Sequence, residues 1–514
     1  MTFPVHPFLL ALYPIMALLA SNIDQVEGAA AWRPSLLSLA AALVLLVVLR
    51  WLTRSWHRGA GLTSLALVAF FTYGHVYDVL KNVEWMGGLV GRHRYLLPGL
   101  SALLLFLSWK ILRVRDGAAM TRLLNTCAVV LLALPLLQIG AYRIRMSSAA
   151  PATRLQVDDL GGTRPAQPPD IYYILLDAYT RQDVLRADFG VDNGPFLARL
   201  GALGFYVADC SQSNYAQTEL SLSTTLNMEY LDQLGQFSPD GHDRTPLLLL
   251  IQQSVVRQAL EQMGYQVIAF ETGYPFIEWK DADVYLRPGR GSGFGIDLPL
   301  TGYEALLLDS TALRILTDAR AVLPPALGGA LQGPVELHRR RVLFTLEQLE
   351  QMAERPGPKF VYAHIVAPHR PYVFAPDAAA PSVQRALLPE FQAGEAGGYV
   401  VGYRNQVLYL NDRLLSILEV IIQDSEVPPI IILQGDHGAD EAPPVERMAI
   451  LNAVRLPGID RATVTESRSP VNTFRIVLAE TFGMDLPLLE EASYYSSYEA
   501  PFDFIEIPVG CKPG

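Results

Sequence analysis

Acidic residues and histidines follow three short aliphatic runs of the chain. These residues are Asp177 after IYYILL, His364 and His369 within FVYAHIVAPHRPY, and Asp436 and His437 after PIIILQG. Such runs are typical of interior strands in an open α/β sheet, whose carboxyl ends meet at one edge. Carboxylate and imidazole groups gathered there suit a divalent cation, and Mn, Mg, Zn and Ca are all compatible. Each residue alone is more often a capping Asp or a core His, but several together favour a metal site.

A candidate nucleophile lies in the stretch NYAQTELSLSTTLNMEYL, which runs from Asn214 to Leu231. Its apolar spacing predicts a helix that begins at Thr218. A hydroxyl at a helix N-terminus sits in positive potential, which favours its alkoxide and an attached phosphoryl group. The structural alternative is that Thr218 is simply the N-cap, a position where Thr, Ser and Asp are preferred.

The elements that must position these residues alternate along the second part of the chain. Strands are predicted at 171–177, 265–270, 360–366 and 429–435, and helices at 183–202, 246–263, 335–352 and 398–422. This alternation predicts an α/β fold with a mostly parallel sheet sandwiched by helices.

The first part of the chain is far more apolar and predicts a transmembrane bundle of about five helices. The expected spans are Val5–Ile23, Leu36–Leu52, Gly61–Val79, Leu96–Leu112 and Leu123–Tyr142, each close to the roughly 20 residues that cross a bilayer. Prolines interrupt the first span, so a signal anchor is its alternative interpretation. We expect a bundle over 1–145, a Pro- and Gly-rich linker over 146–170, and a catalytic domain over 171–514.

Charge is distributed unevenly between these parts. Residues 1–145 carry 13 Lys and Arg against 5 Asp and Glu, and the remainder carries 27 against 46. An acidic domain is a poor candidate for binding nucleic acid, which requires neutralisation of phosphates. Basic residues in alternate loops predict a cytoplasmic N-terminus and, after five crossings, an acidic domain on the outer side of the membrane.

Four motifs in this order resemble those of the alkaline phosphatase/sulfatase superfamily: PDIYYILLD, TELS, PHRPY and GDHG. Within it, the chain is similar to the membrane-anchored lipoteichoic-acid synthases and lipid A phosphoethanolamine transferases, whose N-terminal bundle it shares. The resemblance implies that Asp177, Thr218, Asp436 and His437 bind one metal ion. It further implies that Thr218 becomes phosphorylated during turnover. The resemblance also implies a multi-pass protein of the bacterial inner membrane, with the catalytic domain on the periplasmic or extracellular side.

The resemblance also implies the residues that hold the substrate. They are His369, which would also act in catalysis, together with His364, Trp279 and Ser221. Two departures bear on the substrate. Asp177 stands where those transferases generally have Glu, and Lys280-Asp281 follows Trp279 where lipoteichoic-acid synthases have Asn-Arg, which makes glycerol phosphate a less favoured group.

The implied function is transfer of a phospho-alcohol group, of the phosphoethanolamine or phosphoglycerol type, from a phospholipid donor to an envelope glycan or lipid acceptor. A phosphodiester or sulfate ester hydrolase is an alternative, although the Cys- or Ser-x-Pro-x-Arg context of sulfatases is missing. No His follows His437, which favours one metal over a two-metal phosphatase site. A non-catalytic envelope-assembly scaffold is the other alternative.

Two further expectations concern individual side chains. Cys210 and Cys511 are the cysteines outside the predicted spans, and an oxidising compartment permits a disulfide between them. His75 and Asp78 lie near the outer boundary of the third span, where polar groups are costly and often functional. They either anchor the helix at the headgroup level or help to hold a lipid headgroup.

Overall fold

The computed structural model describes residues 3–23, 25–81, 92–148, 157, 160–235, 237–289, 300–319, 333–375, 396–459 and 469–510. The chain forms two compact units, Met1–Ser148 with Gly295–Pro334, and Ala149–Phe294 with Val335–Gly514. We call the first the helical unit and the second the α/β unit, and each is described by itself.

Five helices lie in the helical unit where the five spans were predicted. They are α1 His6–Ser21, α2 Trp32–Thr53, α3 Trp56–Lys81, α4 His93–Leu112 and α5 Gly117–Ser148. In the described part of the chain, four helices are long and apolar enough to cross a membrane, whereas α1 has only 16 residues. Pro14 lies inside α1 without ending it, as occurs in apolar helices whose neighbours satisfy the freed backbone groups.

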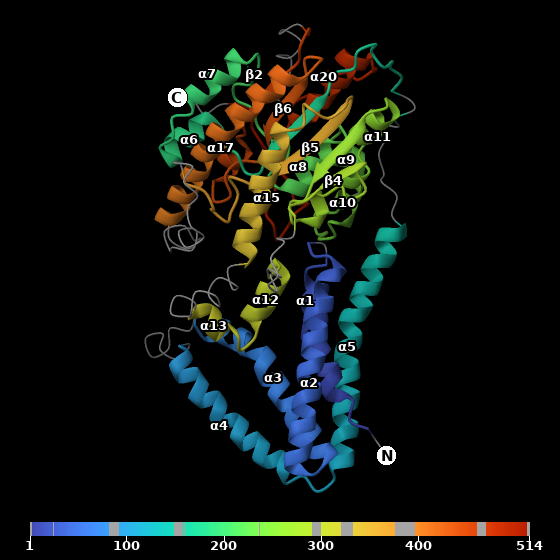
Figure 1. Cartoon of the computed structure of the whole chain (residues 1–514), viewed down its shortest axis with the longest axis vertical. Helices are drawn as coiled ribbons and strands as arrows, with labels where there is room; N and C mark the ends of the chain where they lie inside the picture. Colours follow the sequence, from blue (N-terminus) through green and yellow to red (C-terminus); the bar gives the residue numbers. More distant parts are fainter. Residues whose placement is uncertain are drawn as a thin grey trace. The chain divides into compact units, whose positions relative to one another are not determined.

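The helical unit also contains a segment from the middle of the chain. Two short helices, α12 Gly302–Ser310 and α13 Arg314–Asp318, belong to it and not to the α/β unit (Figure 1). The predicted continuous domain over 171–514 is therefore interrupted. We call residues 300–319 the insert.

The α/β unit is built on one seven-stranded sheet, as predicted. In spatial order its strands are β2 Tyr206–Val207, β7 Asn452–Arg455, β6 Ile430–Gly435, β1 Ile171–Leu176, β5 Lys359–Ile365, β3 Gln266–Phe270 and β4 Val284–Leu286. The five strands from β6 to β4 are parallel, while β7 runs antiparallel to β6, and β2 to β7. The four predicted strands are β1, β3, β5 and β6, and all four are confirmed.

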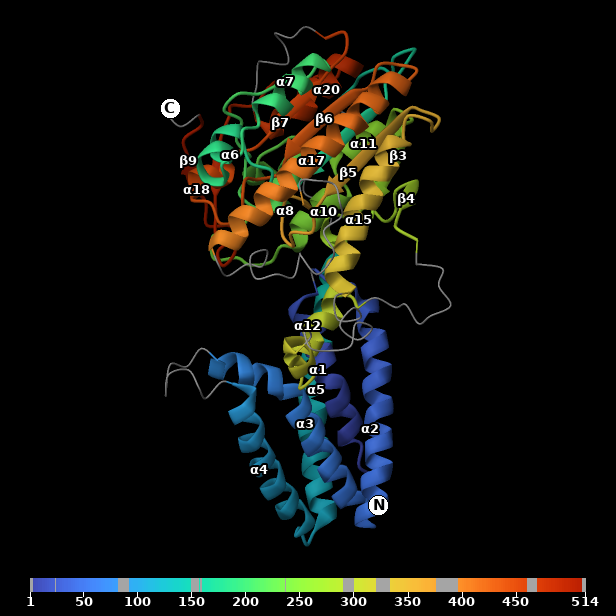
Figure 2. The same ribbon diagram turned by 60° about the vertical axis from the view of Figure 1, so that its left-hand side comes forward.

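Helices cover both faces of this sheet, because β1, β5 and β6 are buried along their whole length and need apolar partners on either side. One face packs against α6 Gln182–Phe189, α7 Gly194–Ala202, α15 Gly333–Glu350 and α17 Ala396–Asp424. The other packs against α8 Thr218–Thr225, α10 Thr245–Gln252, α11 Val255–Gln262 and α20 Pro470–Phe482. Figure 2 shows α15 and α17 side by side across the first face.

Two predicted helices are each broken into a pair. The segment 183–202 forms α6 and α7, because Gly190 ends α6 in the left-handed conformation with φ of 62°. The segment 246–263 forms α10 and α11, which meet at the buried Ser254. The predictions for 335–352 and 398–422 are confirmed as α15 and α17.

The C-terminal part adds three smaller elements, α18 Pro444–Met448 and a two-stranded ribbon of β8 Ser493–Tyr495 and β9 Ile505–Ile507. Cys210 is disulfide-bonded. Its predicted partner, Cys511, lies outside the described residues.

Candidate metal centre and nucleophile

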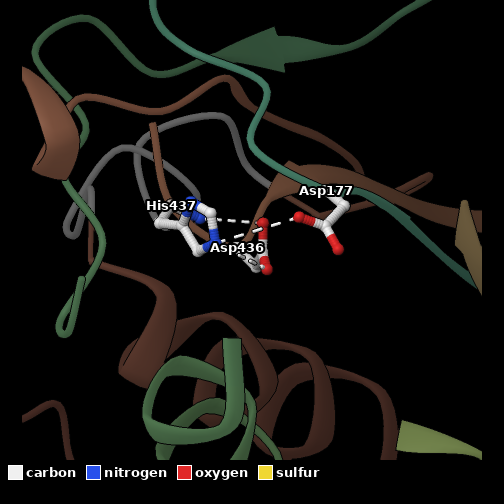
Figure 3. Close-up of side chains that lie close together, drawn as sticks. All are labelled: Asp177, Asp436 and His437. Carbon is white, nitrogen blue, oxygen red and sulfur yellow. Dashed lines mark hydrogen bonds and ion pairs between the residues drawn. The ribbon is translucent and has the colours of Figure 1, made fainter. Parts of the chain in front are cut away.

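The sheet brings the two aspartates together because their strands are neighbours in register. Leu176 at the end of β1 pairs with Gly435 at the end of β6. The next residue of each strand is Asp177 and Asp436, so both carboxylates leave the same edge of the sheet. His437 follows directly, and these three side chains could hold a metal ion, because one candidate ligand atom from each lies within 4.8 Å of the others (Figure 3).

The distances within this group suit a shared cation. His437 Nε2 lies 3.8 Å from Asp177 Oδ1 and 3.5 Å from Asp436 Oδ2. These two carboxylate oxygens are buried and accept no hydrogen bond from any residue that the structure describes. Buried carboxylate oxygens without partners are costly, and a bound cation would satisfy both. The residues present therefore fit a divalent metal ion.

Backbone contacts fix the orientation of the ligands. His437 Nδ1 lies 2.8 Å from the carbonyl of Gly438, which can only accept, so Nδ1 carries the proton and Nε2 presents its lone pair to the cluster. Asp436 Oδ1 accepts from the N–H groups of Ala178 and His437, both at 2.9 Å. Gly438 packs against α18, where a Cβ would lie 2.5 Å from the carbonyl oxygen of Glu446. The glycine of GDHG is thus required by close packing.

Thr218 completes the cluster from the other direction. Its hydroxyl lies 3.2 Å from His437 Nε2. Thr218 is the first residue of α8, and the N-cap position belongs to Gln217, so the prediction that a helix begins here is confirmed and the capping alternative is wrong. All eight residues of α8 are buried. The positive end of the helix is therefore shielded from solvent, and its electrostatic potential is screened less than it would be at the surface.

The segment before Thr218 is held on both sides by side chains. Arg447 Nε donates to the carbonyl of Ala216 at 3.0 Å, and Gln217 Nε2 donates to the carbonyl of Ser496 at 3.1 Å. Arg244 Nη2 donates to Gln217 Oε1 at 2.7 Å. These contacts fix the entry of the chain into α8, and with it the position of the hydroxyl.

Two histidines lie beside the aspartate of β1. His364, on β5, is buried, and its Nε2 lies 3.3 Å from Asp177 Oδ2. His369, in the loop after β5, is partly exposed and donates its backbone N–H to the carbonyl of Asp177 at 3.0 Å. Burial alone would raise the pKa of Asp177, but His369 and His364 lower it below its ordinary value. The carboxylate is therefore ionised at neutral pH, as a metal ligand must be.

Asp440 is a site residue that the sequence analysis missed, although it lies only four positions after Asp436. Its Oδ2 is 3.2 Å from His369 Nε2, and its Oδ1 accepts from Arg447 Nη1 at 2.7 Å. Burial lowers the pKa of His369, but Asp177 and Asp440 outweigh burial and raise it above the ordinary value. The protonated form of the His369 ring is thus favoured by its two carboxylate neighbours.

His338, on α15, was missed as well. It is fully buried, and its Nε2 has no hydrogen-bond partner among the described residues. Burial, helped by the charges of His369 and Arg341, lowers its pKa to about 3. The only feature of the sequence that singles out His338 is that it is the one histidine of the predicted helix 335–352.

Trp279 does not lie where the sequence analysis expected a substrate-binding residue. Its side chain has no exposed surface, its indole N–H donates to the carbonyl of Ile251 at 2.9 Å, and its ring stacks on Tyr362. A ring that is buried on all sides cannot touch a substrate. Trp279 is therefore a core residue on the face of the sheet that α8, α10, α11 and α20 cover. Ser221 lies one turn after Thr218 in α8 and is also buried.

No family model matches the chain, and no curated protein matches it. Among solved structures, it is similar to the C-terminal periplasmic domain of EcEptC from Escherichia coli, with 13% identity, a TM-score of 0.44, and coverage of 70% of this chain and 96% of that one. The lipooligosaccharide phosphoethanolamine transferase EptA from Neisseria meningitidis has 14% identity and a TM-score of 0.40, covering 92% of this chain and 93% of that one.

A third similar structure is BT1596, a 2-O GAG sulfatase, with 12% identity, a TM-score of 0.38, and coverage of 66% of this chain and 74% of that one. With identities of 12 to 14% and TM-scores below 0.5, these similarities do not assign a function to the chain.

Proposed function

We propose that this protein is a membrane-bound, metal-dependent transferase that moves a phospho-alcohol group, of the phosphoethanolamine type, from a phospholipid to an envelope glycan or lipid through a phosphothreonine at Thr218. The observation that carries the proposal is the position of the Thr218 hydroxyl, 3.2 Å from His437 Nε2 and at the N-terminus of α8. A threonine that served only the helix would not need to face a carboxylate and imidazole cluster.

Asp177, Asp436, His437 and Thr218 would hold the divalent cation. When bound, the cation supplies positive charge that stabilises a phosphoryl group and the Thr218 alkoxide. The donor set of oxygens and one imidazole is compatible with Mn, Mg, Zn or Ca.

The protein's own residues carry the group transfer. The Oγ1 of Thr218, as the alkoxide, attacks the phosphorus of the donor lipid, a bond between oxygen and phosphorus forms, and the bond to the diacylglycerol oxygen breaks. His369, kept protonated by Asp440, donates a proton to that departing oxygen. The hydroxyl of an acceptor then attacks the same phosphorus and gives its proton to the neutral His369, while the bond from phosphorus to Oγ1 breaks and Thr218 leaves as the alkoxide.

Two alternatives differ from this proposal in one step each. If water takes the group from Thr218, the protein is a phosphodiester hydrolase. If Thr218 never carries the group, it is an envelope-assembly scaffold. The buried, orphaned oxygens of Asp177 and Asp436 favour a working site over a scaffold, because buried polar groups without partners would destabilise the fold if they had no ligand to bind.

Mass spectrometry of the Thr218 peptide, after purification of the full chain from native membranes, tests the proposal. We expect a fraction of Thr218 to carry a phospho-alcohol whose mass identifies the donor headgroup. The adduct should vanish in Thr218→Ala and persist in Thr224→Ala, a matched control in the same helix whose hydroxyl bonds the carbonyl of Leu220. An unmodified Thr218 after incubation with phosphatidylethanolamine vesicles, with no diacylglycerol released, would support the scaffold instead.

A further inference from the structure

The insert shares the apolar core of the helical unit. Tyr303 and Leu307 are buried in one cluster with Ile15 of α1 and with Leu67 and Phe71 of α3. These two residues lie one turn apart on α12, so a single face of that helix is turned into the bundle. The insert is therefore part of the bundle's packing and not a loop that merely passes beside it.

Hydrogen bonds fix the insert at a particular depth along α3. The backbone N–H of Ala312 donates to the carbonyl of Phe70 at 2.8 Å, and the hydroxyl of Tyr303 donates to the carbonyl of Ile15 at 2.6 Å. At Gly74, an added Cβ would lie 2.1 Å from the carbonyl oxygen of Asp309. The backbones of α3 and the insert thus touch directly.

That depth lies within the hydrocarbon if α3 crosses a bilayer. The 26 residues of α3 extend about 39 Å, against about 30 Å of hydrocarbon, so the helix exceeds the apolar layer by only about 9 Å. Phe70 lies about 16 Å before the end of α3 at Lys81. Even with all the excess at that end, Phe70 remains below the surface of the apolar layer.

Three of the four charged side chains of the insert contact polar or charged side chains of the helices. Glu304 pairs with Arg33 of α2, Arg314 lies 2.9 Å from Asp78 of α3, and Asp318 lies 2.8 Å from His93 of α4. The contacts fall at the start of α2, the end of α3 and the start of α4, which is one end of an up-and-down bundle. Such pairing is how charged groups are tolerated at membrane depth.

Two leucines of the insert are exposed. Leu306 is 51% exposed and Leu316 is 37% exposed. On α3, the helix that the insert contacts, Val76 and Val79 are exposed as well.

From its depth, its paired charges and its exposed leucines, we propose that the insert is seated in the membrane leaflet at this end of the bundle, with Leu306 and Leu316 in contact with phospholipid acyl chains. The occupant of this surface is the bilayer itself. The inference goes beyond the proposed function and does not depend on it, because a scaffold with the same insert would be seated in the same way. The proposal thus places in the membrane a segment that lies far from the predicted spans in the sequence.

Fluorescence quenching by brominated lipids tests this position in the full chain. Leu306→Cys and Leu316→Cys would be made separately in a Cys127→Ser background, labelled with bimane and reconstituted into phosphatidylcholine vesicles with or without bromine on the acyl chains. Cys210 is disulfide-bonded and does not react. We expect at least twofold quenching at both positions by the brominated lipid.

Two labelled controls calibrate the result. Leu137→Cys on α5 is 70% exposed in a candidate span and should be quenched strongly, whereas Leu408→Cys on α17 of the α/β unit is 36% exposed and should not be. The proposal is overturned if positions 306 and 316 behave like 408, with quenching by aqueous iodide instead. Protection from both quenchers would also overturn it, because a protein partner would then cover the leucines. Size-exclusion profiles identify any variant that fails to fold. Because Leu306→Cys and Leu316→Cys are separate variants, either one still tests the position of the insert if the other fails to fold.

Discussion

At the scale of single residues, the candidate site depends on which atoms face each other across the end of the sheet. Asp177, Asp436 and His437 could be predicted, because parallel strands end at a common edge and these residues follow the strands directly. Asp440 and His338 could not, because one lies in an irregular loop and the other on a helix that packs against the sheet. Their positions beside the cluster depend on tertiary packing, and tertiary packing produces no hydrophobic periodicity from which these positions could be predicted.

Thr218→Ala should abolish transferase turnover and change the thermal midpoint little. Thr218 is not the N-cap of α8, so the loss of about 1 kcal/mol typical of a cap should not occur. Thr218→Ser should keep measurable activity, since it keeps a hydroxyl at the same place. Activity and thermal melts would be measured on the same preparations. A lowered midpoint with retained turnover would show that the residue serves only the helix.

Asp440→Asn should move the alkaline limit of activity to lower pH, so that the protein is active over a narrower pH range. Asp440 helps to raise the pKa of His369, so a reaction that needs the protonated ring is active below that pKa and declines as pH rises through it. Without the carboxylate, the pKa falls and the decline moves to lower pH. The pH profile of kcat measures this, and an unchanged alkaline limb would contradict the proton-donor role of His369.

Chelation should remove activity, and a divalent ion should restore it. Elemental analysis of the purified protein should find about one ion per chain, and Asp436→Asn should lower that content by at least tenfold. Thr224→Ala, a control in the same unit whose hydroxyl bonds the carbonyl of Leu220, should leave the content unchanged. A metal-free protein with full activity would argue against the cluster as a metal centre.

At the scale of elements, the central strands were predictable and the edges were not. The strands β1, β5 and β6 are buried along their whole length, so their sequences are largely continuous apolar runs that are easy to recognise. The strands β2 and β4 have only two and three residues, too few for any pattern. The insert was missed for another reason: its partners on α1 to α4 lie more than 200 positions earlier in the chain.

Gly74→Ala should destabilise the packing of the insert on α3. In most helices this change would stabilise, by about 1 kcal/mol, but here the added carbon would meet the backbone of Asp309. We expect a net loss of roughly 1 to 3 kcal/mol, seen as a lower thermal midpoint in detergent. Gly99→Ala on α4, where no atom lies within 4 Å of the added carbon, is the matched control and should not lower it. Equal midpoints for the two variants would mean that the backbones do not touch as described.

At the scale of the whole molecule, the chain forms two compact units, and the insert belongs to the helical unit although it follows β4 in the sequence. The number of spans depends on α1, whose 16 residues reach only about 24 Å. Five spans place the N-terminus and the α/β unit on opposite sides of the membrane, and four place them on the same side.

A topology measurement distinguishes these cases. In the Cys127→Ser background, Thr2→Cys should resist a membrane-impermeant maleimide in intact spheroplasts, while Leu488→Cys in the α/β unit should react. Permeabilised cells, in which both should react, provide the control. Labelling of both positions before permeabilisation would show that α1 does not cross and would overturn the predicted cytoplasmic N-terminus.

The assignment of Gly295–Pro334 to the helical unit has a practical consequence for producing the α/β unit as a soluble protein. A fragment that begins at Ala149 would retain the insert but lose every helix against which it packs. Tyr303 and Leu307 would then lose the core that buries them, and Glu304 would lose Arg33. Such a fragment should aggregate or require detergent, whereas one in which a short flexible linker replaces 295–334 should remain dispersed. Truncation at the end of the last N-terminal helix alone is therefore the wrong boundary for this chain.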